Sequence, residues 1–208
     1  MSKTRRLTES GMLIALAVIL SLLKVYNLPY GGSITLCSML PIIVIGYRYG
    51  SRWGLLSGLV YGVLQMMLGA VEGVFKGTGI GIVLCVILFD YLIAFAVLGL
   101  GGMFKGKIRS TSAALALGTI VVSFLRLAAH FISGYLFFGS YAEWFFSQEG
   151  FTLGQTILSK YSGTLLAAIY SLFYNASYMI PEMIITAAVA AILGAALKNL
   201  GDPQKKLR

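Results

Sequence analysis

Charged side chains are scarce in this sequence: Lys, Arg, Asp and Glu together make up 11% of the residues, whereas 58% are hydrophobic. The mean hydropathy is +0.88. Soluble domains carry about a quarter charged residues, so this composition excludes an ordinary soluble globular protein. It is typical of a protein that crosses the membrane several times.

Histidine, cysteine and catalytic motifs are also scarce. His130 is the one histidine, and Cys37 and Cys85 have no CxxC or other metal-ligand spacing, so we interpret both cysteines as packing residues. The sequence contains no HExxH, GxSxG or Walker A motif and nothing that resembles a nucleic-acid-binding motif. We therefore expect a protein that is not an enzyme, uses no cofactor or metal, and binds no nucleic acid.

Six apolar segments approach the length of about 20 residues that a membrane-spanning helix needs. They cover residues 9–28, 33–47, 53–71, 80–103, 112–138 and 163–197. No linker or low-complexity tract divides the chain. The sequence thus predicts an all-α, polytopic integral membrane protein: one domain over residues 1–208 with six transmembrane helices.

The positive charges predict an orientation for these helices. Twelve of the sixteen Lys and Arg residues fall before the first segment, between the second and third, after the fourth, or after the sixth. Cytoplasmic loops carry the excess of Lys and Arg, so we expect both termini in the cytoplasm and the protein in the bacterial cytoplasmic membrane. The net charge of +9 then follows from topology and from contact with anionic lipid headgroups.

Asp90 is the one charged residue between Ile80 and Phe104. A charge inside the bilayer is costly and marks a functional site by default. At about 1.5 Å per residue, the predicted helices place four polar side chains roughly 10 to 18 Å below the outer surface: Asp90, His130, Tyr170 and Asn175. Three helices therefore bring these groups to one layer, where we expect them to bond one another or a ligand.

Each of these residues also has a structural alternative. A histidine or asparagine inside a membrane protein often only bonds a neighbouring helix. Tyr170 and Asn175 are five residues apart, about 140° around a helix, so they do not share one stripe. Both line one cavity only if the ligand wraps around the helix or the helix is distorted.

Arg126 lies one turn before His130, near the bilayer midplane, where an arginine needs an acidic partner. Asp90 and Glu182 are the available acids, so we expect a structural or gating ion pair. Pro181 interrupts the backbone hydrogen bonds of the sixth segment and predicts a kink beside Glu182.

Aromatic residues surround the predicted polar layer. An acid among aromatic faces suits a flat, cationic ligand, through charge pairing and cation–π attraction. Residues 139–162 combine further aromatic side chains, including Trp144, with Glu143 and Glu149. This stretch predicts either a lid over the site or an ordinary aromatic belt at the headgroup level.

Seven short motifs follow one another along the chain: LPYGGSITL (28–36), MLPI (39–42), YRYG (47–50), FDYLIAFAVLG (89–99), HFISG (130–134), YSLFYN (170–175) and YMIPE (178–182). In their order, spacing and placement they resemble the thiamine-specific substrate-binding component (S component) of energy-coupling factor transporters, over nearly the whole chain. The resemblance implies a six-helix protein that captures thiamine from outside. It also implies a shared membrane coupling subunit and two cytoplasmic ATPases as partners.

The resemblance assigns functional positions to this sequence. Its substrate-binding positions fall on Asp90, Tyr91, His130, Phe138, Tyr170 and Asn175, with Tyr30 in the first outer loop. Some members carry glutamate in place of Asp90 and tryptophan in place of Phe138. The small-xxx-small motif of the family falls on Gly11 and Ala15, which implies docking on the coupling subunit. Packing of these two residues within the domain is the alternative.

We therefore hypothesise a thiamine site in which Asp90 neutralises the cation. Tyr91, Phe138 and Trp144 would stack on the rings of thiamine, and His130, Tyr170 and Asn175 would bond its aminopyrimidine. Three alternatives stay open: an S component for another flat vitamin, such as riboflavin or a pyrimidine derivative; an intramembrane enzyme that uses Asp90 and His130 as an acid–base pair; and a scaffold whose polar layer only locks helices together.

Overall fold

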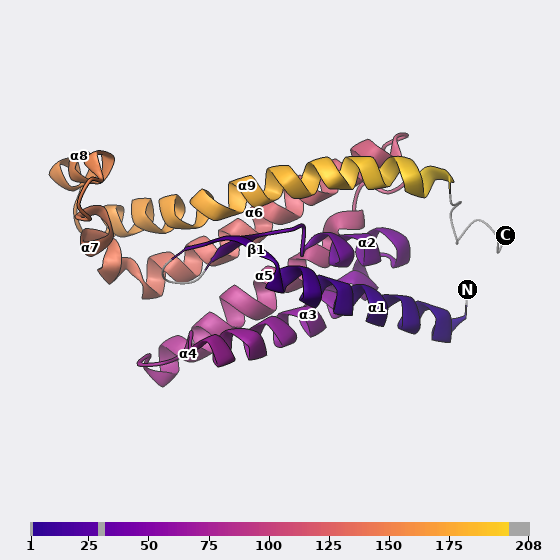
Figure 1. The fold of residues 1–208 in the computed structure, drawn as a ribbon, viewed down its shortest axis with the longest axis horizontal. Helices are drawn as coiled ribbons and strands as arrows, with labels where there is room; N and C mark the ends of the chain where they lie inside the picture. Colours follow the sequence, from indigo (N-terminus) through magenta and orange to yellow (C-terminus); the bar gives the residue numbers. More distant parts are fainter. Residues whose placement is uncertain (1, 29–31, 200–208) are drawn as a thin grey trace.

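The computed structural model describes residues 2–28 and 32–199, with side chains up to Ala196. Most of the chain is helical, and the long helices run roughly along one axis (Figure 1). The helices are α1 (Lys3–Leu22), α2 (Leu40–Tyr49), α3 (Ser51–Glu72), α4 (Ile80–Val86), the π-helix η1 (Ile87–Ile93), α5 (Ala94–Ala96), the 3-10 helix η2 (Val97–Gly102), α6 (Thr111–Phe137), the 3-10 helix η3 (Gly139–Tyr141), α7 (Ala142–Phe146), α8 (Thr152–Lys160) and α9 (Gly163–Asn199). Strands β1 (Lys24–Asn27) and β2 (Ser33–Thr35) form an antiparallel hairpin between α1 and α2.

Four helical stretches among the described residues are long and apolar enough to cross a membrane: Ser51–Glu72, Ile80–Gly102, Thr111–Phe137 and Gly163–Ala196. They match the third to sixth segments predicted from the sequence. The first predicted segment, 9–28, differs at its end, because α1 stops at Leu22 and residues Lys24–Asn27 form a strand. The long helices confirm a helical protein with several candidate membrane spans.

The second predicted segment, 33–47, is wrong as a continuous helix, and the all-α class misses the hairpin. Ser33–Thr35 pairs with β1, and α2 begins only at Leu40. The β-branched Ile34 and Thr35 favour a strand, and Cys37 has a φ of 58°, which an α-helix does not allow. Pro41 fits the first turn of α2, where its missing N–H is not needed.

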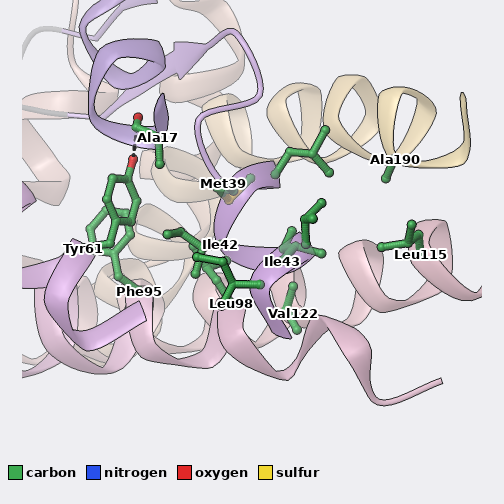
Figure 2. Close-up of a cluster of buried hydrophobic side chains, with 13 residues drawn as sticks. Ala17, Met39, Ile42, Ile43, Tyr61, Phe95, Leu98, Leu115, Val122 and Ala190 are labelled. Carbon is green, nitrogen blue, oxygen red and sulfur yellow. Dashed lines mark hydrogen bonds between the residues drawn. The ribbon is translucent and has the colours of Figure 1, made fainter. Parts of the chain in front are cut away.

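Helix α2 lies at the centre of a large buried cluster. All its residues from Leu40 to Gly46 are buried. Its isoleucines share the cluster with side chains from η2 and α6: Ile42, Ile43, Leu98, Leu115 and Val122 (Figure 2). On another side of the cluster, the Tyr61 hydroxyl of α3 donates to the Ala17 carbonyl of α1 over 3.4 Å (Figure 2). Helix α2 is therefore a core helix rather than a lipid-facing one.

Glycines on α3 let the stretch from α4 to η2 approach closely. Gly54, Gly58 and Gly62 are buried and four residues apart, so they lie on one face of α3. A Cβ atom at Gly58 would lie 2.4 Å from the Phe95 carbonyl oxygen, and one at Gly54 would lie 2.2 Å from that of Gly99. Backbones thus touch along this face, as small residues allow in membrane proteins. This contact fixes the stretch that carries Asp90.

Helices α6 and α9 pack antiparallel along most of their length (Figure 1). Gly134 meets Ser171 towards one end of the pair, and Gly194 meets Ser112 at the other. Helix α1 begins and α9 ends at the same end of the molecule, whereas α7 and α8 lie at the opposite end (Figure 1). Helix α6 of this pair packs against η1.

Candidate functional site

Asp90 lies in the π-helical turn η1. Such turns are rare and frequently occur at functional sites. The side chain is 18% exposed and points towards α6. Its Oδ1 lies 2.7 Å from His130 Nδ1, and its Oδ2 accepts a hydrogen bond of 2.5 Å from the Ser133 hydroxyl. Both carboxylate oxygens are therefore held by one face of α6.

One of the two ring nitrogens of His130 has no hydrogen-bond partner among the described residues. Its side chain is 12% exposed, and Asp90 engages Nδ1. The other nitrogen, Nε2, is buried and has no hydrogen-bond partner among the described residues. A buried polar atom without a partner is costly and calls for an explanation. The arrangement orients the imidazole and leaves Nε2 for a group that the described chain does not supply.

Asn175 of α9 adjoins this pair. Its Nδ2 donates to the carbonyl oxygens of Ser171 at 2.9 Å and of His130 at 3.4 Å. Its Oδ1 accepts a hydrogen bond of 2.9 Å from the Tyr178 hydroxyl. The structure thus joins Asp90, His130 and Asn175 into one polar layer across η1, α6 and α9.

Tyr170 lies in an aromatic cluster beside this layer. Its ring centroid is 5.3 Å from that of Phe145 on α7 and 5.9 Å from that of Tyr174. The row continues to Tyr178, on which the hairpin packs: a Cβ atom at Gly32 would lie 2.7 Å from the Tyr178 ring. Tyr170 faces α7 and Asn175 faces α6, in keeping with their separation of about 140° around the helix.

Two other predicted ring contacts pack on other aromatic side chains. Tyr91 points towards α3, where its ring is 6.0 Å from that of Phe75 and its hydroxyl packs on Gly69. Phe138 ends α6, with its ring centroid 6.3 Å from that of Tyr141.

The remaining predicted contacts are Trp144 and Tyr30. Trp144 is 43% exposed on α7 and borders an open groove of about 460 Å³ together with Glu143 and Tyr161. Tyr30 lies outside the described residues.

Arg126 pairs with Glu182, one of the two acids expected from the sequence. Arg126 Nη1 lies 3.2 Å from Glu182 Oε2, and both side chains are buried. The pair leaves the Asp90 carboxylate to His130 and Ser133. Helix α9 runs unbroken through Pro181, which precedes Glu182.

Gly11 and Ala15 lie on an exposed face of α1. A Cβ atom at Gly11 would meet nothing within 4 Å among the described residues. Packing within the domain therefore does not explain the small residues at these positions. The face is open to another molecule.

Sequence analysis missed Ser133 as a partner of Asp90. The serine is three residues after His130 on α6, so the two side chains share one face. That spacing could have revealed it. In the part of the chain that the structure describes, no three His, Cys, Asp or Glu side chains gather closely enough to hold a metal ion.

Comparison with known proteins identifies the family of this chain. The sequence model of the thiamine transporter protein family (Thia_YuaJ) matches residues 7–148. The thiamine transporter ThiT of Bacillus subtilis (strain 168) is 35% identical over 199 residues, which cover 90% of this chain and 89% of that protein. The chain belongs to the thiamine transporter family. A solved structure of ThiT from Listeria monocytogenes shares the fold of this family member, with a TM-score of 0.66 at 21% identity over 95% of this chain and 97% of that one.

Membership of the thiamine transporter family has two consequences for the alternatives left open by the sequence. The chain is a transport protein rather than an enzyme, so the Asp90 and His130 pair is not the acid–base pair of an intramembrane enzyme. With its apolar helices, the chain is a multi-pass protein of the cell membrane.

Proposed function

We propose that this chain is a thiamine-binding S component that captures thiamine at the outer side of the membrane. The family and the Bacillus relative are named for thiamine transport, which supports thiamine as the ligand. One observation carries the proposal: Asp90 and His130 pair inside a bundle of membrane helices, and His130 Nε2 is buried without a partner among the described residues. This arrangement suits a ligand that accepts or donates a hydrogen bond near a negative charge.

The chemistry of thiamine fits these groups. Thiamine joins a positively charged thiazolium ring to an aminopyrimidine ring. The Asp90 carboxylate supplies the opposite charge in a low-dielectric region, where charge attraction is stronger than in water. His130 Nε2 bonds a nitrogen of the pyrimidine or its amino group, since Nδ1 is engaged by Asp90. Tyr170 and Asn175, which face α7 and α6 respectively, contact the ligand from two faces of α9, so the ligand wraps around this helix.

The aromatic residues around the layer enclose the ligand in this proposal. Phe138 stacks on its rings, Tyr91 does so once its ring turns from α3, and Trp144 joins them when its exposed side chain turns inward from α7. Tyr30, which lies in the sequence between β1 and β2, adds a further contact in this proposal. The ligand therefore binds between the hairpin and α7.

Six membrane crossings, with both termini in the cytoplasm, complete the proposal. Helix α1 has 20 residues and extends about 30 Å, enough for one crossing. The ten residues of α2 extend about 15 Å. The strand Ser33–Thr35 adds about 10 Å, and a turn over residues 36–39 joins it to α2; in this proposal these parts together form the second crossing. Non-helical backbone at this depth is tolerated where protein surrounds it.

Delivery requires partners in this proposal. Gly11 and Ala15 form a flat, exposed strip on α1, which suits close docking of a helix from a membrane coupling subunit. Two cytoplasmic ATPases bound to that subunit supply the energy, because this chain has no ATP-binding motif.

Ligand identity is tested first by mass spectrometry of the small molecules that purify with the protein. We expect thiamine, and saturable quenching of Trp144 fluorescence when thiamine is added to ligand-free protein. Co-purification of a neutral vitamin such as riboflavin, with no response to thiamine, would refute the proposal.

The role of Asp90 is tested by the isosteric change Asp90→Asn. We expect thiamine affinity to fall about 10-fold or more, because a charge-assisted contact is lost. Glu149→Gln is the matched control, since it makes the same charge change at an exposed residue of the α7–α8 region. Equal affinity of Asp90→Asn and the wild type, measured by fluorescence titration, would contradict the assignment.

A further inference from the structure

A second group of buried polar side chains lies next to the ligand layer, between α6, α9 and the segment that joins β2 to α2. Arg126 Nη1 lies 3.2 Å from Glu182 Oε2 and 2.8 Å from the sulfur of Met39. The Thr35 hydroxyl of β2 also bonds the Glu182 carboxylate. Arg126 is one turn from His130 on α6, and Glu182 is one turn from Tyr178 on α9. This polar group therefore lies directly below the ligand layer, on the cytoplasmic side in the proposed orientation.

Three polar atoms of this region have no nitrogen or oxygen partner within the described part of the chain: Nε of Arg126 and the hydroxyl oxygens of Ser123 and Thr186, of which the Thr186 hydroxyl bonds only the Cys37 thiol. The three side chains are only 8%, 3% and 0% exposed. Buried polar atoms are almost always bonded, to protein or to ordered water. Three exceptions in one region point to a bound molecule.

The register of the helix pair places these atoms close together. The helices are antiparallel, and the contact between Arg126 and Glu182 aligns them. Ser123 is three residues before Arg126, and Thr186 is four residues after Glu182. Each is thus about one turn, or about 5 Å, from the ion pair in the same direction along the bundle. At these spacings the side chains lie on the facing surfaces of α6 and α9.

We propose that this region is a hydration site, in which ordered water binds between Ser123, Arg126 and Thr186. The charges of Arg126 and Glu182 cancel, so the region favours a neutral guest over an anion or a metal ion. The Nε–H group only donates, whereas the hydroxyls donate and accept. Water serves both kinds of group at once and needs about 2–4 polar partners, which this region provides.

The neighbouring thiol does not replace this water. The Thr186 hydroxyl donates a hydrogen bond to the sulfur of Cys37. A thiol is only a weak donor and a weak acceptor, so the Thr186 hydroxyl still requires a stronger partner. The thiol forms no hydrogen bond with Arg126 Nε or with the Ser123 hydroxyl, which are both without a partner among the described residues.

Thr186→Val tests the site, because it removes the hydroxyl and keeps the side-chain shape. Thr119→Val is the matched control: Thr119 is equally buried, and its hydroxyl donates within its own helix to the Leu115 carbonyl at 2.9 Å. We expect Thr186→Val to lower the Tm in detergent by about 2–4 °C more than the control does, because bound water loses a partner. A hydroxyl with no partner would instead be better replaced by a methyl group, so an equal or higher Tm overturns the proposal.

Two further measurements do not depend on one variant. Ser123→Ala and Thr186→Val should be non-additive in a double variant, because they share bound water; additive Tm shifts overturn the shared site. A high-resolution crystal structure should show water density within about 3.2 Å of both hydroxyls. Direct protein contacts that satisfy both hydroxyls, with no water between them, overturn it as well.

Discussion

Asp90 lies in the π-helical turn of η1, and two partners on α6 hold its carboxylate at 2.7 Å and 2.5 Å. Ser133 is 1% exposed, so water does not compete for the hydrogen bond between its hydroxyl and Asp90. The serine fixes the carboxylate that the ligand meets, as a positioning residue.

Ser133→Ala should weaken thiamine binding about 10-fold, because a hydrogen bond to a charged group contributes about 1.5–3 kcal/mol. Ser177→Ala is the control, since the Ser177 hydroxyl donates only to Tyr174 of its own helix at 2.7 Å. Isothermal titration of both variants checks the prediction. An affinity loss in Ser177→Ala as large as in Ser133→Ala would contradict it.

The polar layer was predictable from the sequence for a physical reason. The rise of a helix per residue is nearly constant, so depth in the bilayer follows from residue number, and Asp90, His130 and Asn175 meet as their depths require. The directions of the side chains were less predictable from the sequence than their depths. Tyr91 points towards α3, and Trp144 lies on α7, a helix of five residues that is too short for its facing side to be derived from hydropathy.

At the scale of elements, glycine spacing decides how the α4–η2 stretch meets α3. Gly54, Gly58 and Gly62 recur every four residues, which places backbone against backbone. Hydropathy predicted both helices, because each exposes a broad apolar surface. It failed for residues 33–39, where a tertiary contact between Thr35 and Glu182 and the backbone of Cys37 determine the structure.

Gly58→Ala should destabilise the protein, because its Cβ atom would lie 2.4 Å from the Phe95 carbonyl oxygen. Overpacking of this kind costs about 1–3 kcal/mol, which corresponds to a fall of several degrees in Tm. Gly81→Ala on α4 is the control, since a Cβ atom there meets nothing within 4 Å among the described residues, and alanine favours the helix. Thermal unfolding in detergent checks both; a Gly58→Ala variant as stable as Gly81→Ala would show that the helices separate easily.

At the scale of the whole molecule, the start of α1 and the end of α9 lie at one end and α7 and α8 at the other (Figure 1). Charge follows the same division: Lys105, Lys107 and Arg109 precede α6, at the end where α1 begins. By the positive-inside rule, this charge supports the proposed cytoplasmic position of that end.

Single cysteines test this orientation in a background where Cys37 and Cys85 are alanine. A membrane-impermeant maleimide should label Glu149→Cys in intact cells and should label Lys107→Cys only after permeabilisation. Both positions are exposed, so exposure does not separate them. Labelling of Lys107→Cys alone in intact cells would reverse the proposed topology.

The burial of α2 has a consequence for biogenesis. Ten residues extend only about 15 Å, and no side chain from Leu40 to Gly46 faces lipid. A segment this short does not insert into a bilayer as an independent helix. Helix α2 therefore takes its buried position only once η2 and α6 have formed the space that receives it. In the proposed topology, the second crossing is completed by folding within the membrane rather than by insertion of an independent helix.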